Sequence, residues 1–402
     1  MGREVVITGL GVISSIGIGR EDFWKNLTKG VCGIKQVSLF DTSEFKRHKA
    51  GQINDFKPSD FMPKEMVKFL GRASQFAIAA TKLALKDAKI TEKKIKDKKS
   101  AVIIGTTMTE AQVYDISSKM FISEDWDEIT TKTMLNLFSS SIPRNLGHLL
   151  KVKGFNLLIP TACAAANYAL GYGFDLIKKG EIDLAIIGGA DALSRIAFQG
   201  FQRLYAMAPD KCSPFDNDRK GMMLGEGAGV LILESLDSAL ERKATTYSEV
   251  LGYGLSCDAH HMTIPKKEGI VKAIKKALKN SGVCQEDIDY ISAHGTGTQA
   301  NDKAESTAIN EVFENRKIPA SSIKSMLGHC MGAASGLEAI ACCLAIKEGV
   351  VPPTINFETP DPECNIDCVP NKTRRVSLDT ALNNGFAFGG NNCCIIFRKY
   401  NG

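Results

Sequence analysis

A cysteine and two histidines are the side chains of this 402-residue chain best suited to nucleophilic chemistry. Cys163 follows the apolar run 156–159 and precedes three alanines, so we expect it at the turn between a buried strand and a helix. The positive end of the helix dipole and the unpaired N–H groups at such a turn favour a thiolate. The small alanines would let a substrate carbonyl approach the backbone, as in a nucleophile elbow. A lone buried cysteine is more often inert, so this interpretation depends on the rest of the chain.

Two histidines lie in glycine-containing turns beside apolar strands. His294 begins the segment His-Gly-Thr-Gly-Thr after the strand-like stretch 288–291, and His329 ends the segment Lys-Ser-Met-Leu-Gly-His at 324–329. Either histidine alone is typical of a satisfied loop or core residue. Together with Cys163 they form a candidate catalytic constellation.

The elements that must position these residues follow an α/β rhythm. Continuous apolar strands near 5–13, 101–105, 184–190 and 229–234 alternate with helical stretches, and the pattern repeats in the second half of the chain. Such strands predict mainly parallel sheets covered on both faces by helices. We expect one duplicated body whose halves, 1–243 and 244–402, carry the nucleophile and the two histidines. The Ser-, Thr- and Met-rich stretch 106–142 is expected to be irregular and to line a pocket or a subunit interface.

Composition is that of an ordinary globular protein. The chain has 44% hydrophobic and 24% charged residues and a net charge of +5, which gives no argument for nucleic acid but is compatible with a basic patch for an acidic partner. The N-terminus leads directly into a strand, and no apolar run could span a bilayer, so we expect a cytoplasmic protein with reduced thiols and no membrane association. The pairs Cys364/Cys368 and His260/His261 lack the partners of a metal site, so no metal is expected.

Five segments together resemble the β-ketoacyl-acyl-carrier-protein synthases, specifically the elongating type II ketosynthases within the thiolase superfamily. They are residues 161–164 (Thr-Ala-Cys-Ala), 294–298, 324–329, 214–229 (Pro-Phe-Asp through Gly-Glu-Gly-Ala-Gly) and 386–390 (Phe-Ala-Phe-Gly-Gly). Their order and spacing extend over the whole chain. The resemblance implies a duplicated thiolase-like fold with αβαβα layers and two mixed, mostly parallel sheets.

The resemblance also implies an acyltransferase reaction. Cys163 would accept an acyl chain, with the N–H groups of Cys163 and Phe388 as the oxyanion hole. Malonyl-thioester would then lose CO₂, and His294 and His329 would hydrogen-bond the resulting enolate, which attacks the acyl-Cys163 carbonyl to give a 3-ketoacyl thioester. Two aimed donors stabilise charge where it develops, and losing one such donor typically costs ~3 kcal/mol.

Other positions match supporting roles in this family. Lys324 resembles the lysine that supports the site electrostatically, and Glu305 with Asp302 match acidic residues near that lysine. Phe388 also resembles a gate between the acyl pocket and the cysteine. The remaining matches concern the substrate: Thr263, Thr296 and Thr298 for the pantetheine arm, Phe386 in the substrate site, and Met108 at the end of the acyl pocket, where ordinary core filling is an equal alternative.

Four departures from the usual family pattern concern the substrate. They are Asn391 after the Gly-Gly turn, Ile264 after Thr263, Phe155 before the nucleophile strand, and the pair Asn167-Tyr168 after the alanines. These fit a polyketide or other specialised ketosynthase at least as well as fatty acid elongation.

The resemblance implies an acyl carrier protein as partner, which brings the phosphopantetheine arm, and no bound cofactor. Lys64, Lys68, Arg72 and Arg203 could form a basic patch for this acidic protein, although a solvated surface is the commoner explanation of any one of them. A homodimer is expected, with a heterodimer of homologous subunits as the open alternative.

Three other functions are disfavoured by the residues present. A thiolase would need a second cysteine near the C-terminal Gly-rich turn, where this chain has Phe386 to Gly390, and the side chain of Cys330 is expected to point elsewhere. A non-catalytic chain-length partner, or a subunit that only decarboxylates, would tend to lack the nucleophile. The presence of Cys163 disfavours both.

Overall fold

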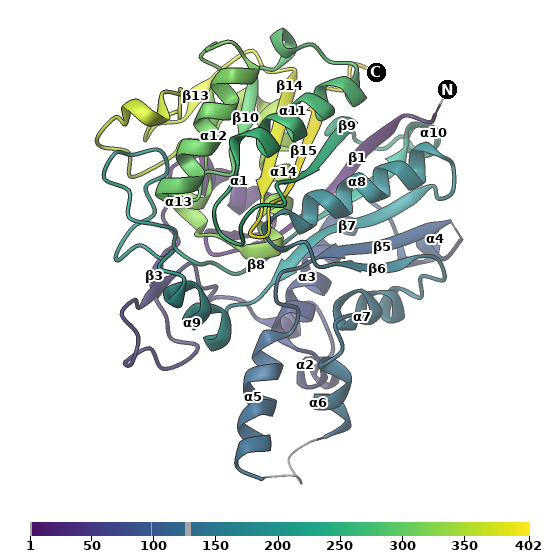
Figure 1. The fold of residues 1–402 in the computed structure, drawn as a ribbon. Helices are drawn as coiled ribbons and strands as arrows, with labels where there is room; N and C mark the ends of the chain where they lie inside the picture. The colour runs from purple at the N-terminus through teal and green to yellow at the C-terminus, as the bar shows by residue number, and fades with distance from the viewer. Residues whose placement is uncertain (1, 98, 125–129) are drawn as a thin grey trace.

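The same strand order occurs twice in this protein. The computed structural model describes residues 2–97, 99–124 and 130–402 (Figure 1). In the first half the strands lie in the order β1-β8-β7-β5-β6, and in the second half in the order β9-β15-β14-β10-β11. The first set is Val5–Ser14 (β1), Ser100–Gly105 (β5), Asn156–Ile159 (β6), Leu184–Asp191 (β7) and Gly227–Ser235 (β8). The second set is Ser248–Cys257 (β9), Tyr290–Ser292 (β10), Ala320–Ser321 (β11), Thr380–Phe386 (β14) and Asn391–Arg398 (β15). The duplication expected from the sequence is therefore confirmed.

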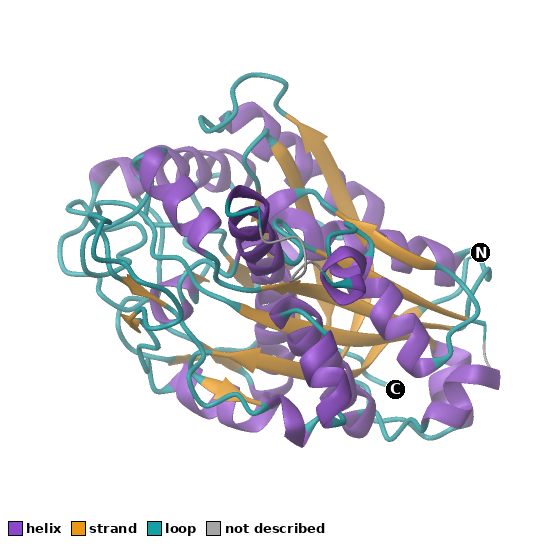
Figure 2. Ribbon diagram, turned by 90° about the horizontal axis from the view of Figure 1, so that it is seen from below, coloured by secondary structure: helices purple, strands orange, loops and turns teal. Residues whose placement is uncertain are grey.

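Helices complete five layers. Helices α8 (Ala165–Lys178) and α14 (Ala334–Glu348) contact strands of both sheets and form the central layer. Helix α3 (Arg72–Asp87) covers the outer face of the first sheet, and α11 (Lys267–Ser281) covers the second (Figures 1 and 2). Helix α14 is buried on all sides from Ala334 to Ile346, as expected for a helix between two sheets. The αβαβα layering is confirmed.

The two sheets are mixed and joined at one edge. Residues 6 and 7 of β1 pair with 249 and 248 of β9, which links the halves into one sheet path. Pairing is parallel within β6-β5-β7 and within β11-β10-β14, whereas β1, β8, β9 and β15 pair antiparallel. The expected predominance of parallel pairing is thus limited to those two groups of strands. A continuous apolar run reports burial on both faces of a strand and says nothing about its direction.

The other elements are short or peripheral. They are β2 (Gly17–Ile18), β3 (Lys35–Gln36), β4 (Lys49–Ala50), β12 (Val350–Val351), β13 (Arg374–Arg375), α1 (Arg20–Thr28), α2 (Lys64–Phe69), α4 (Glu92–Asp97), α9 (Arg195–Arg203), α10 (Leu236–Glu241), α12 (Gln299–Val312), α13 (Lys324–Leu327), η1 (Pro58–Asp60), η3 (Ala162–Ala164), η4 (Gln285–Asp287), η5 (Met331–Ala333) and η6 (Pro362–Cys364). The connection between α10 and β9 contains the predicted boundary between residues 243 and 244, which stays a prediction.

The stretch expected to be irregular, 106–142, contains two helices and the first two residues of a third. Helices α5 (Ala111–Ile122) and α6 (Thr131–Asn136) project from the body beside α7 (Ser141–Leu150) (Figure 1). The expectation was wrong because α5 has few buried side chains, only Ala111 and Ser117, so it presents no single apolar stripe. Ile122 is 85% exposed, and other apolar side chains of this arm are exposed as well: Tyr114, Ile116, Phe121, Met134, Leu135 and Phe138.

No helix among the described residues has the length and apolar character needed to cross a membrane.

Candidate active site

Cys163 lies where the sequence predicted, between a strand and a helix. Strand β6 leads into the single 3₁₀ turn η3, which carries Cys163, and α8 follows immediately. The turn is sharp because Ala162 adopts a left-handed backbone with φ 49°. Gly385 lies against Ala164, where an added Cβ would be 3.4 Å from the Ala164 Cα, so β14 packs directly on the turn.

The thiol of Cys163 is buried and protonated at rest. Burial raises its pKa to about 11, although the Lys324 ammonium and the backbone N–H of Phe388 act in the opposite direction. The backbone N–H groups at the turn favour the thiolate, as expected, but the loss of hydration outweighs them, so the pKa is raised overall. The contact with the Phe388 N–H does place a backbone donor beside the sulfur, as an oxyanion hole requires.

His294 is fixed by its backbone and by its ring. Glu305 of α12 accepts hydrogen bonds from the backbone N–H of His294 and of Gly295, both at 2.8 Å. Lys324 Nζ lies 3.3 Å from Nδ1 of the ring and 2.7 Å from the His294 carbonyl oxygen. Since an ammonium can only donate, Nδ1 is the acceptor and Nε2 carries the ring proton.

His329 has the same tautomer for a different reason. The backbone N–H of Met331 donates to its Nδ1 at 3.1 Å, and the buried Nε2 has no hydrogen-bond partner among the described residues. The two imidazoles meet edge to face, with ring centroids 5.5 Å apart. Burial first, and the charge of Lys324 second, lower the pKa of both rings well below 6.5. Both are therefore neutral N–H donors at neutral pH.

The carboxylate that neutralises Lys324 is one that the sequence reasoning missed. Lys324 Nζ forms a buried ion pair with Glu338 of α14. Glu305 and Asp302 were predicted near Lys324, but in the described structure their hydrogen bonds and ion pairs go to other groups, including the His294 N–H and the Gly297 N–H. Glu338 is an acidic residue in the apolar middle of a helix. An acid in such a position needs a buried partner, and this could have indicated a pairing with a cation from the sequence.

Glu305 and Asp302 instead shape the turn after β10. Asp302 accepts from the N–H of Gly297 and of Phe215, and Arg219 lies beside it, while Arg219 also pairs with Asp361. Burial raises the pKa of Glu305 to about 7 despite its three hydrogen bonds. These acids hold the turn that carries His294 and the two threonines.

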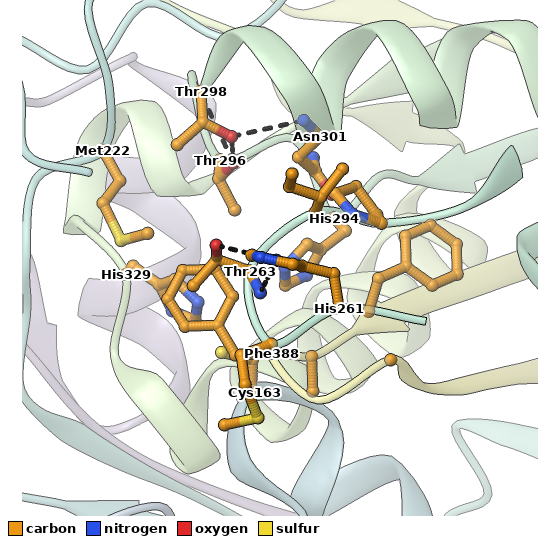
Figure 3. A pocket seen from close by; sticks show the side chains of 16 residues that line it. Cys163, Met222, His261, Thr263, His294, Thr296, Thr298, Asn301, His329 and Phe388 are labelled. Carbon is orange, nitrogen blue, oxygen red and sulfur yellow. Dashed lines mark hydrogen bonds between the residues drawn. The ribbon is translucent and has the colours of Figure 1, made fainter. Parts of the chain in front are cut away.

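One cavity of about 440 Å³ collects the predicted site residues (Figure 3). Of the residues predicted for catalysis or substrate binding, its lining includes Cys163, Thr263, His294, Thr296, Thr298, His329, Phe386 and Phe388. Lys324, Glu305 and Asp302 lie behind the two histidines and are not part of the lining. The cavity thus presents a thiol, two imidazole N–H donors and several hydroxyls to one enclosed space.

Five further lining residues were not assigned to the site from the sequence, although Ile264 was noted as a departure from the family pattern. They are Met222, His261, Met262, Ile264 and Asn301. The sequence suggested only metal binding as a possible role for His261. In the structure its Nδ1 accepts a hydrogen bond from the Thr263 N–H at 3.1 Å. Because His261 is only two residues before the predicted substrate-binding residue Thr263, the sequence could have placed it near the site.

Met108 lies outside this cavity. It packs in an apolar cluster with Phe198, Phe201 and Phe388, and the rings of Phe201 and Phe388 stack with centroids 5.9 Å apart. Phe388 is therefore shared between the cavity that contains Cys163 and the cluster that contains Met108. This arrangement fits a side chain that separates two compartments.

Of the four residues predicted to form a basic patch for the carrier protein, three are exposed and one is largely buried. Lys64, Lys68 and Arg203 are exposed. The Arg72 side chain is only 17% exposed and forms an ion pair with buried Glu226, so it belongs to the interior. Its position at the first residue of α3 could not be distinguished by sequence from a surface site. A groove beside α9 adds further cations, namely Lys46, Arg47, Arg195 and Lys220.

Among the described residues, no three His, Cys, Asp or Glu side chains are grouped as metal ligands. Cys330 is buried and its sulfur faces the carbonyl oxygens of Glu226 and Gly328, so it points away from the cavity, as expected.

Comparison with known families matches both halves of the chain. Residues 2–239 match the model of the beta-ketoacyl synthase N-terminal domain, and residues 247–358 match that of the C-terminal domain. A 3-oxoacyl-(acyl-carrier-protein) synthase 2 of Synechocystis sp. is 39% identical over 99% of this chain and 98% of its own length. The protein of the same name from Staphylococcus aureus strain COL is 35% identical over 99% of both chains.

Solved structures agree. The structure described as the ishigamide ketosynthase/chain length factor has a TM-score of 0.96 and 44% identity, with all of both chains covered. A type II polyketide ketosynthase in complex with its acyl-carrier protein has a TM-score of 0.91 and 31% identity, again over all of both chains.

Proposed function

The chain belongs to the β-ketoacyl synthase family, and we propose that Cys163, His294, His329 and Phe388 carry the reaction of that family here. The protein is a condensing acyltransferase, a 3-oxoacyl-(acyl-carrier-protein) synthase of fatty acid or polyketide biosynthesis. The observation that supports the residue roles most directly is that the thiol, both imidazoles and Phe388 line one cavity.

The first step is transfer of the acyl chain to Cys163. The sulfur attacks the carbonyl of a carrier-bound thioester, and the oxyanion is held by the N–H groups of Cys163 and Phe388. The carrier thiolate leaves and takes the proton that Cys163 gives up, so the step needs no external acid or base. The protonated resting thiol agrees with a nucleophile that loses its proton only when a substrate is bound.

The second step is decarboxylation of malonyl-thioester. Loss of CO₂ leaves an enolate whose negative charge lies on the thioester oxygen. The Nε2–H groups of His294 and His329 are fixed donors for that oxygen, since both Nδ1 atoms are occupied as acceptors. The enolate carbon then attacks the acyl-Cys163 carbonyl, the C–S bond to the cysteine breaks, and the cysteine thiolate takes up one proton from solvent, which the overall reaction consumes. Lys324, held by Glu338, orients His294 from behind.

The substrate arm enters past the threonines at the cavity mouth. The hydroxyls of Thr263, Thr296 and Thr298 are suited to hydrogen-bond the amides of a phosphopantetheine arm, which arrives on the carrier protein. We expect no separate cofactor for this chemistry, because no electron or group carrier is needed.

The carrier protein is acidic, and the cations around α9 and α2 are suited to receive it. The proposed docking surface contains the exposed residues Lys64, Lys68 and Arg203, as the sequence predicted, together with Arg195 and Lys220 from the groove beside α9. It does not contain Arg72, because that side chain forms an ion pair with buried Glu226. We propose docking there because Lys220 of the groove and Met222 of the cavity are two residues apart in the chain.

We also propose a dimer formed across strand β6. This strand is the edge of the first sheet, its neighbour Phe155 is exposed, and the apolar arm of α5 and α6 lies on the same half (Figure 1). An unprotected edge strand with apolar neighbours normally pairs with another chain. A second copy is the occupant we propose, in the cytoplasm; a homologous subunit is the alternative, and the native mass of the protein purified alone decides between them.

The experiment that tests the function is intact-mass analysis. The protein and its Cys163→Ala variant are incubated with acyl-carrier-protein thioesters of different lengths, and any adduct is mapped by peptide. An adduct on Cys163 with a length preference supports the condensing role. If no donor leaves an adduct while malonyl-thioester still loses CO₂, the protein is a decarboxylase or partner subunit and the proposal fails.

A further inference from the structure

We propose that Asp191 is a positioning residue that ties the His329 donor to the loop carrying Met108, so that one carboxylate holds the decarboxylation site and the acyl-pocket wall in register. This inference rests on the proposed function, because it assigns Met108 to the acyl pocket and His329 to decarboxylation.

Asp191 is the last residue of β7 and is fully buried. Among the described residues it forms no ion pair, and its carboxylate accepts four hydrogen bonds from two separate loops. Oδ1 accepts from the Thr106 hydroxyl at 2.7 Å and the Met108 N–H at 2.9 Å. Oδ2 accepts from the N–H of Thr107 and of Gly332, both at 2.7 Å. A buried carboxylate without a cation depends on such donors for its stability, and these donors in turn depend on it.

The first loop leads directly to His329. Gly332 and Met331 are neighbours in η5, and the Met331 N–H is the group that holds Nδ1 of His329. Met331 is in the left-handed region with φ 53°, a strained conformation that its surroundings must maintain. By anchoring Gly332, Asp191 fixes the turn that orients the histidine ring and its tautomer.

The second loop leads to the apolar cluster. The anchored N–H groups of Thr107 and Met108 set where the Met108 side chain leaves the backbone, and that side chain packs in the cluster with Phe198, Phe201 and Phe388. A displacement of this loop would therefore move the wall that we assign to the acyl pocket.

Close packing leaves the two loops no independent freedom. An added Cβ on Gly332 would lie 2.5 Å from the Thr106 carbonyl carbon, and one on Gly189 would lie 2.4 Å from the Gly332 oxygen. The loops thus touch each other and the end of β7 through bare backbone. Because packed contacts of this kind transmit displacement, a change at Asp191 reaches both His329 and Met108.

The internal duplication gives an independent reason to expect a functional anchor here. Turn η5 precedes α14 as η3 precedes α8, and Ala162 and Met331 share the left-handed backbone. In the first case Phe388, beyond the end of β14, contacts Cys163; in the second, Asp191 at the end of β7 contacts Gly332. The two halves use equivalent strand ends to hold the two turns that carry chemistry.

The test uses the full-length protein and Asp191→Asn, which keeps the shape of the side chain but replaces two acceptor sites by an NH₂ group. We measure release of CO₂ from malonyl carrier protein, and Cys163 acylation rates over a series of acyl lengths. We expect decarboxylation to fall about 10- to 100-fold, as for a small misplacement of a reacting group. We also expect the ranking of acyl lengths to change.

A second pair of variants covers the case in which Asp191→Asn does not fold. Thr106→Val removes one donor to Asp191 at nearly constant shape, and Thr106→Ser retains the hydroxyl. We expect Thr106→Val to change both readouts in the same direction and Thr106→Ser to restore them.

Glu234→Gln is the matched stability control. Glu234 is a buried carboxylate that accepts from Thr8 and Arg242, and it pairs with Leu184 at the opposite end of β7 from Asp191. We expect this variant to lower Tm without altering the acyl-length ranking.

Two results would overturn the inference: Asp191→Asn or Thr106→Val that lowers Tm while both readouts stay at wild-type values, or a change in only one of the two readouts. A wild-type protein that releases no CO₂ would contradict the proposed function instead, and so the two failures are distinguishable.

Discussion

The backbone N–H of Met331 lies 3.1 Å from Nδ1 of His329, only two residues earlier in the chain. This local contact decides which ring nitrogen carries the proton, and the buried Nε2 then has no partner in the part of the chain that the structure describes. A buried donor without a partner is costly, so it is normally retained for a ligand. This relationship supports our proposal that Nε2 of His329 donates a hydrogen bond to a substrate oxygen.

Replacing His329 should separate the two half-reactions. His329→Ala removes one of two donors to the enolate oxygen, and we expect release of CO₂ from malonyl carrier protein to fall by about 10²- to 10³-fold. Acylation of Cys163, followed by intact mass, serves as the control and should remain. Decarboxylation within about threefold of wild type would contradict the assigned role.

Alkylation of Cys163 should depend steeply on pH. The pKa of the thiol is raised to about 11 by burial, so at neutral pH the thiol form dominates, and the reactive thiolate should increase about tenfold per pH unit below the pKa. The measurement is the iodoacetamide rate on the Cys163 peptide between pH 7 and 10. Lys324→Met should slow alkylation further, because Lys324 acts to lower that pKa. A rate that is already constant above pH 7 would disprove this account.

The stability difference between wild type and Glu305→Gln should vary with pH. The pKa of Glu305 is raised from 4.5 to about 7, so the folded state binds a proton more tightly than the unfolded state. The stability from this group is then fully present below about pH 4.5 and is lost as pH rises through 7, by on the order of 3 kcal/mol. The measurement is the Tm of both proteins from pH 4.5 to 8. As pH rises, the Tm of the wild type should fall relative to the Tm of the variant. A constant difference contradicts the assignment.

The buried pair Lys324–Glu338 should show strong coupling. Lys324→Met or Glu338→Leu alone leaves one buried charge without its partner, which typically costs about 3–5 kcal/mol. The double variant removes both charges, so its Tm should exceed that of either single variant, although its decarboxylation should be impaired because His294 loses the contact with Lys324. Additive losses in Tm would show that the pair is not coupled.

Reversing charge on α2 should weaken carrier-protein binding. We expect Lys64→Glu with Lys68→Glu to raise KM for carrier-bound substrates by about tenfold at low salt, with less effect at high salt. Lys93→Glu with Lys94→Glu is the control, because it makes the same change in net charge on α4, away from α2 and α9 (Figure 1). An unchanged KM for both donor and acceptor would remove these lysines from the docking surface.

Several parts of the site were readable from the sequence because their signals are local. Cys163 at a strand–helix turn, and His294 and His329 in glycine-containing turns, depend only on neighbouring residues, and the structure gathers all three in one cavity. The duplication was also readable, because each half repeats the same alternation of apolar strands and helices.

Contacts between distant segments were not readable. Three findings depend on segments that are separated in the sequence and meet only in the folded protein. They are the pairing of Lys324 with Glu338, the anchoring of two loops by Asp191, and the interior position of Arg72. The same holds for strand direction, since an apolar run is buried whether its neighbour is parallel or antiparallel.

The protonation states of Cys163, His294 and His329 are determined by the tertiary structure, not by the sequence alone. Sequence determined which groups could react and that two histidines accompany one cysteine. Burial decided that the thiol and both imidazoles are neutral, because the loss of hydration from a folded interior is a sum over all surrounding segments and exceeds the effect of the local helix end.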